Sequence, residues 1–150
     1  MILLDYYDNA EKWYDSAKFS ITGEFYQQSV SQSCLAVELF LKSKLVLIDP
    51  NSELDKSHDT INILKEILKK YPTEKDLMPA ARNCRKYFNE SRYPNNGTDI
   101  YTKELAYEFI KYVENIKDYI DTDCQATLDD LLNKYGKDPS INTGPYNPPD

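Results

Sequence analysis

Apolar residues recur at helical spacing along almost the whole chain, and this periodicity restricts the fold more than any other feature. No window alternates convincingly between apolar and polar residues, as a half-buried strand would. The β-like run Val46-Leu47-Ile48 continues a helical pattern. The low number of glycines, 4 in 150 residues, also argues against a turn-rich β fold and a glycine-rich phosphate loop. The sequence therefore predicts an all-α protein.

The longest apolar pattern predicts a helix from about Glu24 to Ile48. Its apolar residues form two stripes, so we expect this helix at the centre of the protein, with neighbours on both sides. An earlier helix ends at Thr22-Gly23, and Asp49-Pro50-Asn51 stops the central one. The apolar face of the first helix carries Tyr6, Ala10, Trp13, Ala17 and Ile21.

Three further helices are expected after a polar loop from Asn51 to Ser57, and a short sixth one near the end of the chain. Their expected starts and stops fall on residues that cap or break helices. These are Ser57 and Pro72 for the third helix, Thr73, Asp76 and Pro79 at the start of the fourth, and Thr98 or Asp99 before the fifth. The inward residues of the fifth are Leu105, Phe109, Val113, Ile116 and Ile120, and those of the sixth are Leu128, Leu131, Leu132 and Tyr135.

Short connections between long amphipathic helices are typical of an up-and-down bundle, here of five to six helices. A chain of 150 residues suits one domain, which we expect to span residues 1–135. Residues 136–150 are rich in Pro, Asn and Gly, so we expect an irregular tail there.

The chain is acidic, with 18 Lys and Arg against 25 Asp and Glu and a net charge of −7. A protein that binds long nucleic acid through its whole surface is normally basic, because Lys and Arg replace the counterions on phosphate. Any nucleic-acid contact must therefore come from a local basic area. The densest one is Arg82, Arg85 and Lys86, which leads to Arg92. A solvated helix face also accounts for it.

Three widely spaced cysteines, Cys34, Cys84 and Cys124, form no CxxC pair. We therefore expect reduced, mostly buried thiols in a cytoplasmic protein, with no disulfide framework. The lone histidine has no metal-ligand spacing, so neither a metal site nor a cofactor is expected. The segment Met1–Asp5 has no basic start and no long apolar run follows it, which predicts neither a signal peptide nor a membrane span.

Four stretches, in order, resemble the HEPN domain family over about Asp5 to Ile120. They are Trp13-Tyr14-Asp15-Ser16-Ala17; Gly23-Glu24-Phe25-Tyr26 leading to Ala36-Val37-Glu38-Leu39-Phe40-Leu41-Lys42; Ser57-His58-Asp59-Thr60-Ile61; and Ser91-Arg92-Tyr93-Pro94. The resemblance implies a dimerising helical bundle that binds nucleotides or RNA. Many members are ribonucleases, and many sit beside a small nucleotidyltransferase in toxin–antitoxin or defence systems.

The chain departs from the ribonuclease members at one point. Those members use an arginine followed four to six residues later by a histidine, which suits charge stabilisation and proton transfer at a phosphate. The only histidine here, His58, precedes every arginine. The catalytic pair is therefore absent from the sequence, and no catalytic residue is assigned.

The candidate phosphate-binding residues are Arg92, Lys42, His58, Arg85 and Tyr93. Arg92 offers a planar, permanently charged fork just before an expected helix N-terminus, where anions are favoured. Tyr93 suits stacking on a base. Each residue also has a structural interpretation: a loop salt bridge for Arg92, packing for Tyr93, an ion pair with Glu38 for Lys42, and capping or packing for His58.

Three hypotheses follow, in order of preference. The first is a dimeric HEPN module that binds a nucleotide or RNA phosphate. The second is an interaction subunit, whose partner would be a protein such as a nucleotidyltransferase. The third is a divergent, metal-independent ribonuclease that uses His58.

Overall fold

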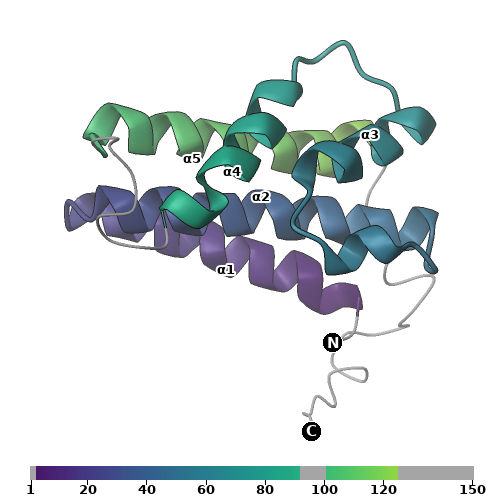
Figure 1. The fold of residues 1–150 in the computed structure, drawn as a ribbon, viewed down its shortest axis with the longest axis horizontal. Coiled ribbons are helices and arrows are strands. Elements are labelled where there is room, and N and C mark those ends of the chain that lie inside the picture. Colours follow the sequence, from purple (N-terminus) through teal and green to yellow (C-terminus); the bar gives the residue numbers. More distant parts are fainter. Residues whose placement is uncertain (1–2, 92–100, 125–150) are drawn as a thin grey trace, which may run out of the picture.

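The computed structural model describes residues 3–91 and 101–124 (Figure 1). Within these residues there is no strand, which confirms the predicted all-α fold. The elements are α1 (Leu3–Thr22), α2 (Tyr26–Ile48), the 3-10 helix η1 (Glu53–Lys56), α3 (Thr60–Lys70), α4 (Met78–Glu90), α5 (Lys103–Asp118) and the π turn η2 (Tyr119–Asp123). Residues of the predicted sixth helix and of the tail lie outside the described part.

Helix α2 is the centre of the bundle, as its two apolar stripes predict. It contacts α1, α3, α4 and α5, and Figure 1 shows α1 and α5 running along it while α4 crosses it. Most of its residues are buried, including the small polar residues Ser29, Ser33 and Ser43. Because α2 is covered on several sides, its few charged side chains must find partners inside the protein.

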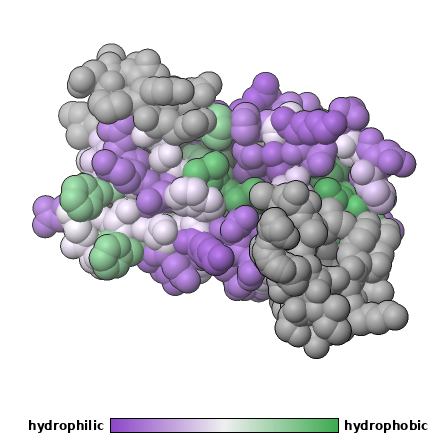
Figure 2. Space-filling view, turned by 90° about the horizontal axis from the view of Figure 1, so that it is seen from below, coloured by the Kyte–Doolittle hydropathy of each residue, from purple (hydrophilic) through white to green (hydrophobic). Residues whose placement is uncertain are grey.

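The turn between α1 and α2 exposes apolar side chains. Glu24 has a φ of 63°, outside the helical region, so α2 begins at Tyr26 and not at Glu24. A Cβ atom at Gly23 would lie 2.8 Å from the Phe25 ring, so glycine lets this ring fold back over the turn. Phe19 and Phe25 are both exposed, and Figure 2 shows apolar surface at the left-hand end, where α1 passes into α2.

The start of α3 differs from the prediction. Its N-cap is Asp59, whose carboxylate accepts from the Asn62 N–H, so the assignment of Ser57 as cap is wrong. Ser57 instead closes η1 by donating to the Leu54 carbonyl. This 3-10 helix occupies most of the segment expected to be a polar loop. Three residues, Ser57, His58 and Asp59, connect it to α3.

The caps of α4 and α5 also differ. Thr73 does not cap α4; its hydroxyl donates to Asp123 near the end of the described chain. Helix α4 begins at Met78 with Pro79 in its first turn, as predicted. The N-cap of α5 is Thr102, which accepts from the Leu105 N–H, so neither Thr98 nor Asp99 caps it.

The core is apolar and follows the predicted spacing. The inward residues of α5 and η2 are buried, except for the half-buried Leu105. All three cysteines are buried and free, as expected. None of the helices within the described ranges combines the length and apolarity that a membrane crossing requires.

Candidate functional site

A buried ion pair lies on α2. The Lys42 Nζ is 2.8 Å from Glu38 Oε2, and the two side chains are 6% and 5% exposed. This is the predicted pair at a spacing of four residues. Charges removed from water must be paired, and each neutralises the other here. Lys42 therefore faces a carboxylate in the described structure.

Glu38 also holds the imidazole of His58. The His58 Nδ1 lies 3.0 and 3.1 Å from the two Glu38 carboxylate oxygens, although His58 is twenty residues away in sequence. A carboxylate only accepts hydrogen bonds, so Nδ1 carries the donated proton and Nε2 is the nitrogen left for another partner. The His58 side chain is 57% exposed, in contrast to the carboxylate that holds it.

Helix α4 supports the other side of this imidazole. The ring stacks on Phe88, with ring centroids 4.2 Å apart and planes 24° apart. His58 thus packs, as one of its two structural interpretations predicts, while Asp59 does the capping. Held by a carboxylate at its edge and a phenyl ring on its face, the imidazole has a defined orientation at the surface.

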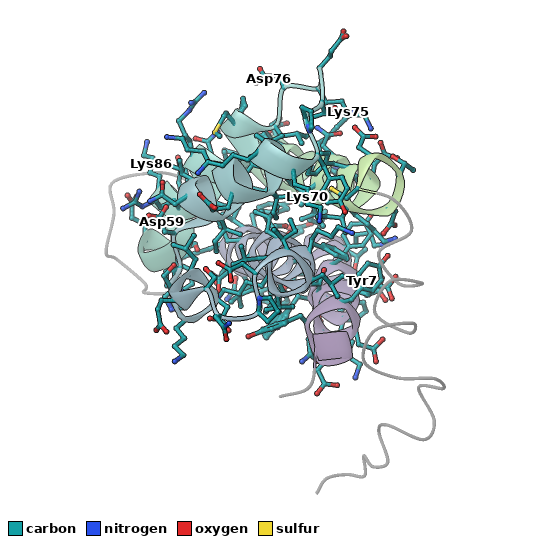
Figure 3. The ribbon with its side chains drawn as sticks, turned by 90° about the vertical axis from the view of Figure 1, so that its right-hand side faces the viewer. Tyr7, Asp59, Lys70, Lys75, Asp76 and Lys86 are labelled. Carbon is teal, nitrogen blue, oxygen red and sulfur yellow. The ribbon has the colours of Figure 1, made fainter. Side chains whose placement is uncertain are left out.

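Arg85 lies on the same helix, one turn before Phe88. Its Nη1 is 3.3 Å from Asp59 Oδ1, and its side chain is 55% exposed. Arg82 and Lys86 on α4 are exposed too, and Figure 3 places Asp59 and Lys86 on one flank of the molecule, away from Lys75 and Asp76. The buried charges of Glu38 and Lys42 cancel. Asp59 offsets only part of the charge of Arg85, because the Arg85 side chain remains mostly exposed to water.

Arg92 and Tyr93 lie outside the described residues, but the end of α4 is placed. The Ser91 N–H donates to the Tyr87 carbonyl, and the Gln27 amide donates to the Ser91 carbonyl over 3.1 Å. Ser91, the residue before Arg92 in the sequence, lies about one helical turn beyond Phe88. Among the candidate residues, the structure places Lys42 and His58 on the same carboxylate, Glu38, and Arg85 beside the neighbouring Asp59.

A second feature was missed by sequence reasoning. An open pocket of about 460 Å³ lies where α1, the first half of α2 and the end of α4 meet. It is lined by Trp13, Gln27, Gln28, Ser31, Gln32, Leu35 and Ser91. The signal was present in the sequence, because the first turns of α2 are rich in Gln and Ser, and Gln28 and Ser31 lie there at helical spacing. Glu38 and Lys42 continue the same row of α2 at steps of three and four residues.

A separate polar network ties α1 to α5. The Tyr7 hydroxyl donates to Asp121 over 2.7 Å, and Lys117 donates to both of these residues. Burial, together with the hydrogen bond to Asp121, raises the pKa of Tyr7 to about 12. Tyr14 donates to Glu114 nearby on α5. We call Tyr7, Lys117 and Asp121 the α1–α5 clamp.

The sequence model of the HEPN domain matches residues 3–122. The chain belongs to the HEPN domain family. The match includes α1 to α5 and every residue of the described site, and it confirms the resemblance carried by the four sequence stretches. No curated protein and no solved structure matches the chain.

Proposed function

We propose that this HEPN domain is a cytoplasmic binding module for the phosphate of a nucleotide or RNA, located at the end of α4 beside His58. The observation that supports this most is the His58 imidazole, exposed at the surface yet held by Glu38 and Phe88. A side chain with a fixed orientation and a polar edge facing water is suited to bind a ligand.

In this proposal Arg92 supplies the charged fork for the phosphate, and Arg85 adds positive charge from the preceding turns of α4. His58 offers its Nε2 edge, and Tyr93 stacks on a base. Lys42 acts through Glu38, since its ammonium already pairs with that carboxylate. The module works as a homodimer and needs no cofactor, and its size in solution can be measured by light scattering.

Thermal denaturation with ATP, GTP and a short RNA tests the proposal. A ligand at tenfold excess over its dissociation constant stabilises the folded state by about 1.4 kcal/mol. We expect stabilisation of the wild type and its loss in Arg92→Ala. The matched control is Arg82→Ala, which removes the same charge from an exposed position on α4. If none of the three ligands raises the melting temperature, the proposal is wrong.

A second candidate function is a metal-independent ribonuclease centred on His58. The contact between Glu38 and His58 Nδ1 favours it, because a carboxylate at one ring nitrogen orients many catalytic histidines and supports proton transfer at the other. RNA cleavage that persists with EDTA, disappears in His58→Ala and remains in Arg82→Ala would establish this activity. If the protein does not cleave RNA, the ribonuclease proposal is wrong and the proposal of a binding module stands.

Pairing with a nucleotidyltransferase in a toxin–antitoxin or defence system is the remaining proposal. It is supported by family membership alone. Co-expression with the product of an adjacent gene, followed by gel filtration, tests it directly. Co-elution supports an interaction subunit, and separate elution argues against one.

A further inference from the structure

We propose that the open pocket formed by α1, α2 and the end of α4 is a subsite for a nucleobase, adenine in particular. This inference rests on the proposed phosphate site and names the class of ligand that the same site takes. The pocket is defined by Trp13, Gln27, Gln28, Ser31, Gln32, Leu35 and Ser91, and all seven residues are described by the structure.

The chemistry of the lining residues favours a neutral, flat, polar ligand. Not one of the seven carries a charge, so the pocket itself does not offer an anion a partner. Amide groups carry a donor and an acceptor side by side, which matches the N6 and N7 edge of adenine. The half-buried indole of Trp13 offers an aromatic surface for stacking. A volume of about 460 Å³ lies within the range of small-molecule sites.

Two of the amides are held in place before any ligand binds. Gln27 donates to the Ser91 carbonyl, and Gln32 accepts from the Ser20 hydroxyl over 2.7 Å. The second bond fixes which end of the Gln32 amide faces Ser20, and therefore where its NH₂ donors lie. Fixed amides reduce the conformational entropy that binding would otherwise cost. Gln28, in contrast, is exposed and is the side chain best suited to substitution.

The pocket and the proposed phosphate site are neighbours along two elements. On α2, Gln28, Ser31 and Leu35 line the pocket, and Glu38 follows Leu35 on the same face one turn later. Directly after α4, Ser91 lines the pocket, and the next residue in the sequence is Arg92. A base in the pocket would therefore place its phosphate on the side of Ser91 and of the contact between Glu38 and His58.

Trp13 is the only tryptophan, so its fluorescence reports on this pocket alone. The experiment titrates the full chain with ATP, adenosine and inorganic triphosphate, following Trp13 emission and, in parallel, heat by calorimetry. We expect ATP and adenosine to change the emission saturably. We expect triphosphate to release or absorb heat without this change, because it lacks a base.

The variant Gln28→Ala should weaken the affinity for ATP by about tenfold. This corresponds to about 1.4 kcal/mol, within the range for an amide–base pair. It should leave triphosphate affinity unchanged. The control Lys12→Ala alters an exposed residue of α1 beside Trp13 but outside the pocket, and should bind both ligands normally.

The outcomes separate the two proposals. If ATP and triphosphate bind equally well and Trp13 emission stays constant, the phosphate site stands and the nucleobase subsite is refuted. If adenosine changes the emission and triphosphate does not bind, the base pocket stands and the phosphate site fails. If Gln28→Ala binds ATP as the wild type does, the pocket assignment is wrong even where emission changes.

Discussion

The α1–α5 clamp and the cluster around His58 are both polar links between helices, yet they differ in what they show to water. In the clamp, Tyr7, Lys117 and Asp121 bond to one another, and the two charged side chains are less than one-third exposed. In the His58 cluster, Glu38 is almost fully buried while the imidazole it holds is mostly exposed. The clamp fastens two helices. The cluster uses a buried carboxylate to orient a surface group.

This difference predicts which substitutions change the stability of the fold and which change ligand binding. Changes to the clamp should alter stability without altering ligand binding. Changes at Glu38 should alter both, and changes at His58 or Arg85 should alter binding with little effect on stability.

Removal of the Glu38 carboxylate should have the largest effect. In Glu38→Ala the buried Lys42 ammonium loses its partner, and an uncompensated buried charge costs about 3–5 kcal/mol. Urea denaturation measures this as a lower midpoint at unchanged slope. The matched variant Asp121→Ala removes a carboxylate from the clamp, where the partner Lys117 can reach water, and should lose clearly less. Equal losses for the two variants would contradict the distinction.

Tyr7→Phe should reduce the free energy of unfolding by about 1 kcal/mol at neutral pH, since one hydrogen-bonding hydroxyl is lost. It should also make the free energy of unfolding depend less on pH in the alkaline range. The pKa of Tyr7 is raised to about 12 from its ordinary 10.0, mainly by burial, so the folded state holds the phenolic proton more tightly. The associated stability is present below pH 10 and is lost as the pH rises toward 12.

Melting temperatures measured between pH 8 and pH 12 test whether stability falls in this direction. The wild type should lose stability more steeply than Tyr7→Phe across this interval. Tyr14 and Tyr112, whose pKa values are also raised to about 12, keep part of the slope in the variant. A steeper slope in the variant would show that Tyr7 is not stabilised in its neutral form. ATP binding should be the same in both proteins.

His58→Ala should change the free energy of unfolding by less than about 1 kcal/mol, because the ring is largely exposed and its loss creates no cavity. It should nevertheless weaken the affinity for ATP by about tenfold, the loss expected for one hydrogen bond to a charged group. Calorimetry measures the ATP affinity of His58→Ala and of the wild type, and urea denaturation measures their free energies of unfolding. A large loss of stability with intact binding would assign His58 to the scaffold.

Arg85→Ala should have the smallest effect on stability, within about 0.5 kcal/mol, because exposed ion pairs contribute little. Its effect on binding should appear mainly in the salt dependence. The slope of log affinity against log salt should become shallower than in the wild type, since one positive charge near the phosphate is gone. Lys65→Ala, an exposed lysine on α3, should leave the slope unchanged.

Much of this architecture could be predicted because apolar spacing is a local property. The central position of α2 and the pair Glu38–Lys42 both follow from steps of three and four residues. The caps were harder, since several capping residues compete within a few positions: Ser57 with Asp59, and Thr98 and Asp99 with Thr102. Which one caps depends on where the chain turns, and packing against neighbouring helices decides that.

The candidate site depends on contacts between distant residues, and local pattern does not encode these. His58 meets Glu38 because η1 returns the chain to the side of α2, and it meets Phe88 because α4 crosses there. The pocket combines residues from α1, α2 and the end of α4. Sequence alone named His58, Lys42 and Arg85 as candidates and paired Lys42 with Glu38. It did not show that Glu38 also holds His58, or that Phe88 stacks on the imidazole.

His58 is the only histidine, so its imidazole signals in ¹H–¹⁵N correlation spectra are unambiguous. The most direct test of an anion site beside the His58 imidazole is to follow these signals while inorganic triphosphate is added at constant ionic strength. The account predicts a saturable displacement in the wild type and in Arg82→Ala, and none in Arg92→Ala. Imidazole signals that stay in place in the wild type, at concentrations where calorimetry detects binding, would contradict it.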